Sequence, residues 1–364
     1  MTLLLSPLPA LDEDAIERAR AHQAQLTKPP GSLGRLEELG IWYAGVRGRF
    51  PAAVPGRGEL FVFAADHGVA AEGVSAYPAE VTEAMVRNFR AGGAAVNVLA
   101  RQSGLAVTVV DVGVNRPVME LLTPDAKAAG AGGAPSFVAA RVRAGTRNFR
   151  REPALTLAEA GAAHAVGMRL AGEAAARGAD LLVGGDMGIA NTTSATALLC
   201  AFGGDDPEAV VGRGTGVDDA GLARKAQVIR DALALHRLDR ADALGVLAAV
   251  GGLEIAALAG LMHGGAAHRL PVIVDGYIAG AAALVATRLA PGVRDFLLLS
   301  HLSAERGAGR LAALLGGPPP LVDLGLRLGE GTGATLAVPL LRAAVALQNE
   351  MATFAGAGVP DRQV

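Results

Sequence analysis

The sequence predicts an α/β protein in which a parallel, doubly wound sheet has helices on both faces. Short apolar runs alternate along the chain with longer helical patterns, and this order is typical of parallel sheets. Of the 364 residues, 51% are hydrophobic but only 4% are aromatic. A core built from Ala, Leu and Val suits helices that pack closely on such a sheet. The length allows two domains, or one large domain with a smaller one.

Six apolar runs bounded by Gly, Pro or polar residues are interpreted as strands. They cover residues 60–64, 105–112, 181–183, 246–250, 271–274 and 296–300. Helical patterns are predicted at residues 12–26, 34–47, 80–99 with a break at Gly92-Gly93, 157–178 and 334–347. Asp12 or Asp14 is a candidate cap for the first helix. A Gly- and Ala-rich loop is expected at residues 126–135, and a loosely ordered tail after Ala355.

Composition and charge argue against several classes of function. The chain has 33 basic and 35 acidic residues and a formal net charge of −2, so it lacks the basic surface of a nucleic-acid binder. Its single cysteine, Cys200, rules out an intrachain disulfide and is compatible with a reducing cytoplasm. Apolar stretches such as 272–289 are interrupted by polar residues, and residues 1–11 have no positively charged signal-peptide region. We therefore expect a soluble, cytoplasmic protein without a membrane segment.

No metal site or covalent nucleophile is predicted. The seven histidines are scattered, and none has a His-x-x-x-His partner (His22, His67, His164, His236, His263, His268 and His301). Neither a Gly-x-Ser-x-Gly elbow nor a Cys/His arrangement is present. No Gly-x-Gly-x-x-Gly follows an N-terminal strand, which argues against a Rossmann-type oxidoreductase.

The strongest local signal for binding lies at residues 181–196. There a buried strand is predicted to run into a glycine turn, and a helix then opens at Asn191-Thr192-Thr193-Ser194. Helix N-termini bind phosphate, although an ordinary N-cap by Asn191 or Thr192 explains the same residues. The segment is not a P-loop, because no Gly-Lys-Ser/Thr follows. Asp186 stands alone, whereas the usual phosphoribosyl-pyrophosphate site has two adjacent carboxylates.

Further glycine-rich or polar loops are expected to converge with this one. They lie at residues 65–69, 212–216, 251–254, 274–277 and 300–307. Most follow predicted strands, and in a parallel sheet such loops meet at one crevice. Asp66 and His67 are adjacent, so their side chains should point to opposite faces and should not form a dyad with each other.

Glu330 is the only acid/base side chain in a turn that contains Gly329, Gly331 and Gly333. Such a density of glycine carries an entropic cost unless the backbone bends sharply or approaches a ligand closely. Loop glutamates are mostly exposed, so the local sequence fits a solvated side chain as well as a functional one.

Five motifs occur in a fixed order along the chain. They are Lys28-Pro-Pro-Gly-Ser-Leu-Gly-Arg-Leu-Glu37, Ala65-Asp-His-Gly-Val69, Gly73-Val-Ser-Ala-Tyr-Pro78, Asp186-Met-Gly-Ile-Ala-Asn-Thr-Thr193 and Arg327-Leu-Gly-Glu-Gly-Thr-Gly-Ala334. Together they resemble the nicotinate-nucleotide–dimethylbenzimidazole phosphoribosyltransferase family of the cobalamin nucleotide-loop pathway. The resemblance extends over about residues 12–350.

This resemblance implies a Rossmann-like large domain at residues 50–325 and a small helical domain formed by residues 1–49 and 326–364. It also implies a homodimer that transfers the phosphoribosyl group of nicotinate mononucleotide to 5,6-dimethylbenzimidazole, without a metal or cofactor. The products would be α-ribazole 5′-phosphate and nicotinate. Two alternatives stay open: a non-catalytic nucleotide-binding regulatory protein, and the same transferase with a different lower-ligand base. Ala79 stands where many family members have Gln, which leaves the choice of base open.

The resemblance also implies roles for individual residues. Glu330 would be the general base, assisted by Asp186, which stands where relatives usually have Glu. The phosphate and ribose would lie against Gly188, Ala190, Asn191, Thr192, Thr193, Gly214 and Lys225. The incoming base would lie against Tyr77, Met85, Met187 and Leu328. Further pocket candidates are Lys28, Asp66, His67, Asp275, Ser300 and His301.

Overall fold

The central feature of the fold is one fully parallel six-stranded sheet in the order β3-β2-β1-β4-β5-β6. We describe it from a computed structural model that covers residues 7–116, 118 and 133–360. The strands are β1 (Gly58–Ala65), β2 (Leu105–Gly113), β3 (Ser136–Ala139), β4 (Leu181–Met187), β5 (Val272–Val274) and β6 (Leu297–Leu299). The strand order reverses between β1 and β4, and ligands bind beside such a switch point in open α/β sheets. The predicted Rossmann-like α/β class is confirmed.

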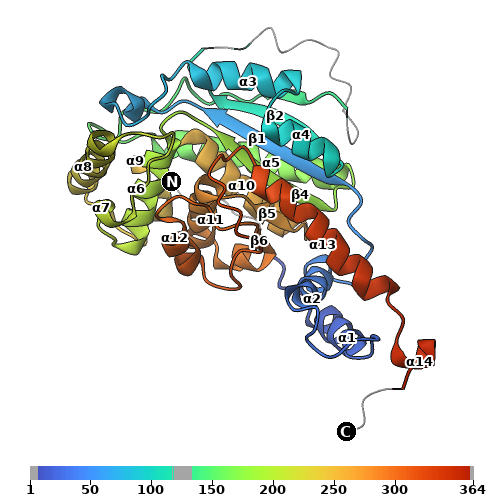
Figure 1. Ribbon diagram of the computed structural model, residues 1–364. Helices are drawn as coiled ribbons and strands as arrows, with labels where there is room; N and C mark the ends of the chain where they lie inside the picture. The colour runs from blue at the N-terminus through green and yellow to red at the C-terminus, as the bar shows by residue number, and fades with distance from the viewer. Residues whose placement is uncertain (1–6, 117, 119–132, 361–364) are drawn as a thin grey trace.

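Helices cover both faces of the sheet (Figure 1). One face carries α3 (Val81–Ala91), α4 (Ala95–Gln102) and the first half of α13 (Thr332–Glu350). The other carries α5 (Leu157–Ala176), α10 (Leu253–Ala267) and α11 (Tyr277–Leu289). Further helices between residues 68 and 315 are η1 (Gly68–Glu72), α6 (Asn191–Gly203), α7 (Pro207–Val210), α8 (Asp219–His236), α9 (Ala243–Val250), η3 (Pro291–Phe296) and α12 (Ala308–Leu315).

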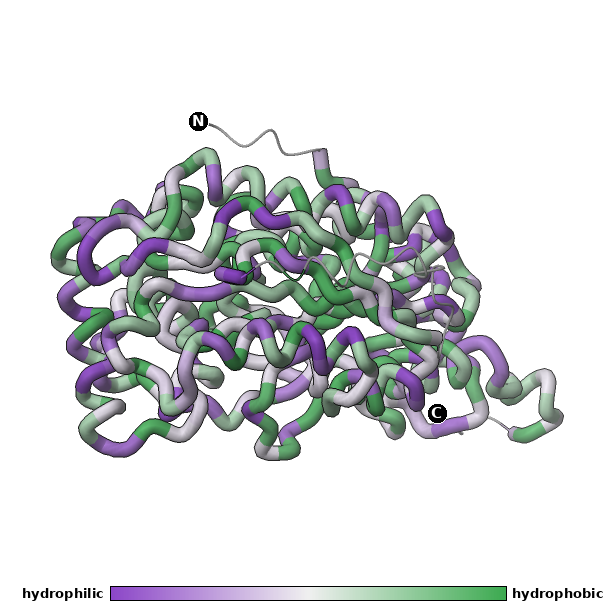
Figure 2. Tube along the Cα trace, turned by 90° about the horizontal axis from the view of Figure 1, so that it is seen from above, coloured by the Kyte–Doolittle hydropathy of each residue, from purple (hydrophilic) through white to green (hydrophobic). Residues whose placement is uncertain are grey.

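Alternation along the strands divides the core into two layers. Leu60 and Val62 of β1 pack with α3, α4 and α13, whereas Phe61 and Phe63 pack with the α5 and α10 side. All eight residues of β1 are buried, as expected for a central strand covered on both faces. Along the Cα trace the hydrophobic residues gather toward the middle, and hydrophilic residues dominate the outer turns (Figure 2).

The helices predicted from the sequence are present, with changes at their ends. Asp12 caps the first helix, because its carboxylate accepts a hydrogen bond from the Ala15 N–H at 2.8 Å. The helical pattern at residues 80–99 is broken at Gly92, as predicted, where the backbone is left-handed. The loop expected at residues 126–135 lies mostly outside the described residues. The tail after Ala355 includes the end of a short helix, and its last four residues are also outside them.

Three strand predictions need correction. Residues 246–250 form the end of helix α9, which begins where the Asp242 carboxylate accepts from the Gly245 N–H. A short run that is apolar on every side has no period to separate helix from strand, and α9 is buried nearly all round. The short strand β3 was not predicted. Strand β4 continues through Gly184, Gly185 and Asp186, where a turn was expected.

A group of helices from both ends of the chain lies beside the sheet (Figure 1). α1 (Glu13–Gln23), α2 (Arg35–Arg47) and α14 (Phe354–Ala357) gather around the end of α13. The Gln23 amide donates to the Gln348 side chain at 3.2 Å, and Leu26 forms a bridge with Thr353. The first half of α13 packs on the sheet, so this helix is shared by both parts. The domain division at residues 50 and 325 therefore stays a proposal.

Helix α13 contains an internal proline, Pro339. Proline has no N–H, so it leaves the carbonyl four residues earlier without its helical partner. Here that carbonyl belongs to Thr335, and the Ser103 hydroxyl donates to it at 3.2 Å. The helix is thus completed by a side chain from the end of α4. Among the described residues, no helix is long and apolar enough to cross a membrane.

Helices α5 and α10 pack backbone against backbone. A Cβ added at Gly260 would overlap the carbonyl group of His164, so we expect Gly260→Ala to push the helices apart and cost about 2–4 kcal/mol of unfolding free energy. Gly309 in α12 has open space around it, so Gly309→Ala should be neutral or add about 0.5–1 kcal/mol. Chemical denaturation of both variants measures the difference, and equal stabilities would contradict this packing.

Candidate functional site

The C-terminal ends of β1, β4, β5 and β6 bring most predicted site residues to one edge of the sheet. Asp66 and His67 follow β1, Asp186 lies near the end of β4, Asp275 follows β5, and Ser300 and His301 follow β6. This convergence matches the expectation from a parallel sheet. The strand ends alone do not supply Glu330, which arrives in the turn before α13.

The Glu330 turn is strained and lies directly on β4. Gly329, Glu330 and Gly331 have φ angles of 79°, 64° and 95°, all in the left-handed region. Glu330 is not glycine, so this conformation costs free energy, and such strain clusters at functional sites. A Cβ at Gly185 would overlap the carbonyl group of Glu330, so only glycine permits the close approach.

The Glu330 carboxyl is buried rather than solvated. The residue is 6% exposed, and its Oε2 has no hydrogen-bond partner among the described residues. Burial raises the pKa of Glu330 from 4.5 to about 7, and the nearby Asp275 carboxylate adds to the rise. A hydrogen bond from the Val96 backbone N–H opposes it. A carboxyl of this pKa accepts and releases protons near neutral pH, as a general base must.

Asp275 holds the Glu330 turn in place. Its Oδ2 accepts from the Gly331 N–H at 3.2 Å, and its Oδ1 accepts from the Ala334 N–H at 2.9 Å. This carboxylate thus caps the start of α13, where negative charge is favoured. The imidazole Nδ1 of His301 lies 3.8 Å from Asp275 and 3.0 Å from the Ser300 hydroxyl. Burial raises the pKa of Asp275, while His301 and the backbone donors oppose that rise.

Asp186 links the Glu330 turn to helix α6. Its Oδ2 accepts a hydrogen bond from the Asn191 side-chain amide at 3.0 Å. A Cβ at Gly329 would lie 3.1 Å from Asp186, so the turn passes close to this carboxyl. Burial, followed by repulsion from Asp275 and Glu254, raises the pKa of Asp186 well above its ordinary range.

Residues 188–193, which we call the α6 cradle, begin that helix without a side-chain cap. Neither Asn191 nor Thr192 is the N-cap, contrary to one reading of the sequence. The N-cap is Ala190, a non-glycine residue with a left-handed φ of 75°. The Asn191 and Thr193 N–H groups donate within the turn, to the carbonyls of Gly188 at 3.1 Å and Ala190 at 3.0 Å. The positive end of the helix dipole still favours an anion at this point, so the α6 cradle is a candidate phosphate site.

Lys225 of α8 brings a positive charge to the α6 cradle. Its ammonium donates to the Thr192 hydroxyl at 2.9 Å and to the Gly212 carbonyl at 3.0 Å. Burial lowers the pKa of Lys225 to about 8. A Cβ at Gly214 would lie 2.7 Å from the Thr192 hydroxyl, and Arg327 donates to the Gly214 carbonyl at 2.8 Å. These contacts connect the predicted phosphate residues with the loop that leads to Glu330.

The four residues predicted to line the base pocket differ in exposure. Tyr77 is 55% exposed and Leu328 is 58% exposed, whereas Met85 and Met187 are half-buried against the core. The turn that holds Tyr77 is attached to the 212–216 loop, because the Thr215 hydroxyl accepts from the Ala76 N–H at 3.0 Å. The exposed Tyr77 and Leu328 are available to cover a flat ligand.

Lys28 lies outside this set of contacts. Its ammonium pairs with Glu37 of α2 at 2.8 Å, within the group of terminal helices. Both side chains are largely buried there. The place of Lys28 in the site stays a prediction.

Asp66 and His67 do not form a dyad, as their adjacency predicts. The Asp66 Oδ2 accepts from the Asn115 N–H at 2.7 Å. The His67 Nε2 lies 2.6 Å from Glu254 and its Nδ1 lies 3.0 Å from the Ser194 hydroxyl. No role was predicted for Glu254 from the sequence. The available signal was a charged residue two positions after Gly251-Gly252. The 0% exposure of Glu254 is unusual for a charged side chain.

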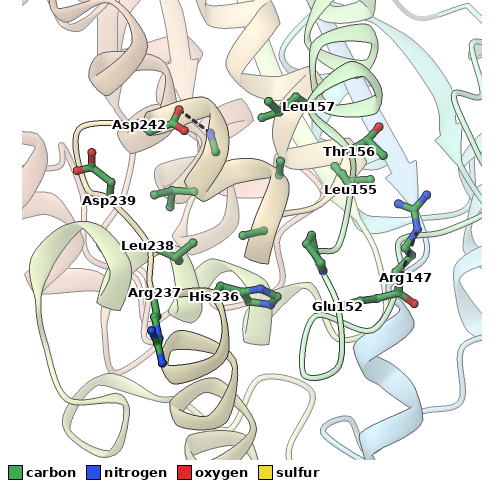
Figure 3. Close-up of a pocket in the computed structure, with 15 residues that line it drawn as sticks. Arg147, Glu152, Leu155, Thr156, Leu157, His236, Arg237, Leu238, Asp239 and Asp242 are labelled. Carbon is green, nitrogen blue, oxygen red and sulfur yellow. Dashed lines mark hydrogen bonds and ion pairs between the residues drawn. The ribbon is translucent and has the colours of Figure 1, made fainter. Parts of the chain in front are cut away.

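A spacious pocket lies elsewhere, beside α5, α8 and α9 (Figure 3). It has a volume of about 600 Å³ and contains none of the predicted site residues. Its main polar groups are engaged: Arg147 pairs with Glu159, His236 with the Phe149 carbonyl, and Asp242 caps α9. The convergence of buried charges makes the strand-end region the better candidate. The described residues contain no group of His, Cys, Asp or Glu side chains that could hold a metal ion.

Comparison with known proteins identifies close relatives over nearly the whole chain. A family model described as phosphoribosyltransferase matches residues 8–359. The nicotinate-nucleotide–dimethylbenzimidazole phosphoribosyltransferase of Salinispora tropica is 52% identical over 97% of each chain. The enzyme of that name from Desulforudis audaxviator is 50% identical over 96% of this chain and 95% of its own length. A crystal structure of such an enzyme from Thermus thermophilus is 47% identical, with a TM-score of 0.87, and covers 97% of this chain and 100% of that one.

The buried Glu330 carboxyl should reduce stability at neutral and alkaline pH. Its folded-state pKa of about 7 lies above the unfolded value of 4.5, so stability is lost as pH rises between these values. We expect Glu330→Gln to be more stable than the wild type by about 1–3 kcal/mol at pH 8, and by less at pH 5. Denaturation at both pH values measures this. The exposed Glu350→Gln is the control, and a Glu330→Gln gain that does not depend on pH would contradict the burial argument.

Proposed function

The chain belongs to the nicotinate-nucleotide–dimethylbenzimidazole phosphoribosyltransferase family, and on that premise we propose that it transfers a phosphoribosyl group from nicotinate mononucleotide to 5,6-dimethylbenzimidazole. The products are α-ribazole 5′-phosphate and nicotinate. The observation that carries the proposal beyond the names of relatives is the Glu330 carboxyl. It is buried, has one oxygen without a partner, and has a pKa near 7.

The chemistry of this transfer calls for such a group. Nicotinate bound to ribose is a cationic pyridinium, so it leaves C1′ as a neutral ring nitrogen without protonation. The incoming benzimidazole attacks C1′ through one nitrogen while its other nitrogen carries a proton. Glu330 accepts that proton, a contribution worth about 10²- to 10⁴-fold in rate. Attack on the face opposite the leaving group gives the α configuration.

The α6 cradle and Lys225 bind the 5′-phosphate in this proposal. Supporting this are the uncapped helix start, the hydroxyls of Thr192 and Thr193, and the Lys225 ammonium on Thr192. The Thr193 hydroxyl is fully buried and has no hydrogen-bond partner within the part of the chain that the structure describes. Asp186, held by Asn191 beside the Glu330 turn, lies between the α6 cradle and the base and assists Glu330.

The remaining pocket roles are proposed on the same basis. Tyr77, Met85, Met187 and Leu328 contact the incoming base, and Asp275 and His301 support the Glu330 turn. We also propose that the enzyme is a homodimer and acts in the cytoplasm. These two statements rest on the family resemblance and on the single buried Cys200, which is compatible with a reducing compartment.

Turnover over a panel of bases tests both the reaction and its selectivity. We expect the wild-type protein to convert nicotinate mononucleotide and 5,6-dimethylbenzimidazole into ribazole phosphate and free nicotinate, detected by liquid chromatography. Adenine and an unsubstituted benzimidazole should be run beside it, because Ala79 leaves the choice of base open. Product with another base only would support the alternative lower ligand. Binding of the nucleotide without any product would favour a non-catalytic regulatory protein.

The general-base role of Glu330 predicts a specific kinetic defect. Glu330→Gln should lower kcat by about 10²- to 10⁴-fold while the KM for the base changes little. In the wild type, the carboxylate form is the active one, so kcat should rise as pH increases through about 7. The Glu350→Gln control should keep both the rate and the pH profile. A wild-type rate in Glu330→Gln would remove Glu330 from this role.

A further inference from the structure

The imidazole of His67 lies between three segments that meet behind the α6 cradle. It comes from the end of β1, and a Cβ at Gly188 of the α6 cradle would lie 3.2 Å from its ring. A Cβ at Gly252, which begins α10, would overlap the same ring. Both ring nitrogens are engaged, one by Ser194 in the first turns of α6 and the other by Glu254 of α10. The ring thus joins β1, α6 and α10 at one point.

The hydrogen-bond directions follow from burial. The side chains of His67 and Glu254 are 0% exposed, and the Glu254 Oε2 has no partner. A buried pair with net charge is costly, so the pair is either imidazolium with carboxylate or neutral imidazole with carboxylic acid. In both arrangements Nδ1 carries a proton, because Nε2 either donates to the carboxylate or accepts from the acid. Nδ1–H therefore donates to the Ser194 hydroxyl oxygen.

A second contact ties the α6 cradle to the same strand end. The Ile189 N–H donates to the Thr82 hydroxyl at 3.1 Å. The Thr82 side chain also bonds to Asp66, and this bond opposes the rise that burial causes in the pKa of Asp66. The neighbours Asp66 and His67 therefore hold the α6 cradle in two places. This arrangement fixes backbone groups without occupying the first N–H groups of the helix with a side-chain cap.

We propose that Glu254, His67 and Ser194 form a positioning assembly that sets the α6 cradle for the phosphate of the nucleotide substrate. None of the three needs to touch that substrate. They act by holding the helix start against the ends of β1 and α10, so that its dipole and hydroxyls meet the phosphate without reorganisation. The proposal rests on the proposed function, because that function supplies the phosphate-bearing substrate.

Ser194→Ala is the central test, because it removes one hydroxyl and leaves the imidazole in place. The variant should raise the KM for nicotinate mononucleotide about tenfold, and calorimetry should show a similar rise in its Kd. The KM for the base should stay within twofold. His67→Gln should behave in the same direction. Glu254→Gln should stay closer to the wild type, because its amide N–H can donate to Nε2 and leave the proton on Nδ1.

Tyr277→Phe is the matched control. The Tyr277 hydroxyl bonds to Thr196 on the same helix at 3.0 Å, two residues beyond Ser194, and phenylalanine keeps its volume. Its KM for the nucleotide should change less than twofold. An equal rise in this control, an unchanged Kd in Ser194→Ala, or an equal loss for both substrates would overturn the proposal.

Calorimetry keeps this test separate from that of the proposed function. Wild-type turnover tests the transferase reaction, whereas the ratio of nucleotide Kd values between Ser194→Ala and wild type tests the positioning assembly. Circular dichroism establishes that each variant is folded before it is compared. If His67→Gln does not fold, the smaller Ser194→Ala change still decides the outcome.

Discussion

The contact between the Glu330 turn and the backbone of β4 is the constraint around which the site is built. It requires that Gly185 has no side chain, and it places three consecutive left-handed residues against a central strand. The turn cannot hold this strained shape alone. The Asp275 carboxylate accepts hydrogen bonds from the N–H groups of Gly331 in the turn and Ala334 in α13. Strand β5, which pairs with β4, positions Asp275 there. The parallel sheet thus acts as a rigid support for one carboxyl.

Several buried acids lie near that carboxyl, and their repulsion has a cost. Asp275 raises the pKa of Glu330, and Asp275, Glu254 and Glu330 raise that of Asp186. A fold selected only for stability would place apolar or paired side chains here, because buried like charges are unfavourable. Burial, with a smaller contribution from Asp275, brings the pKa of Glu330 to about 7, where proton transfer works at neutral pH. Stability and reactivity are therefore opposed at this site.

Much of the architecture could be predicted from the sequence, because apolar runs typical of strands alternate clearly with helical patterns along the chain. The sheet class followed from alternation, and the segments that carry Asp186 and Asp275 were singled out by their position at predicted strand ends. The roles of these two residues came from the family resemblance. Two failures have a common cause. The run at residues 246–250 is helical because helices surround it, which the local sequence does not show, although the Asp242 cap lies only four residues before it. Glu254 was missed because its partner His67 lies 187 positions away in the chain. Burial of Glu330 likewise depends on contacts made by tertiary packing.

Pro339 has a mechanical consequence for the site. It stands within the 19-residue helix α13, which begins beside Glu330 and ends among the terminal helices. Before the proline, Asp275 and Ser103 anchor the helix to the sheet and α4; after it, Gln348 bonds with Gln23 of α1. A helix bends most readily at such a residue. Any bending between the terminal helices and the sheet would therefore be concentrated at Pro339, nine residues beyond Glu330, and not at the turn that holds the carboxyl.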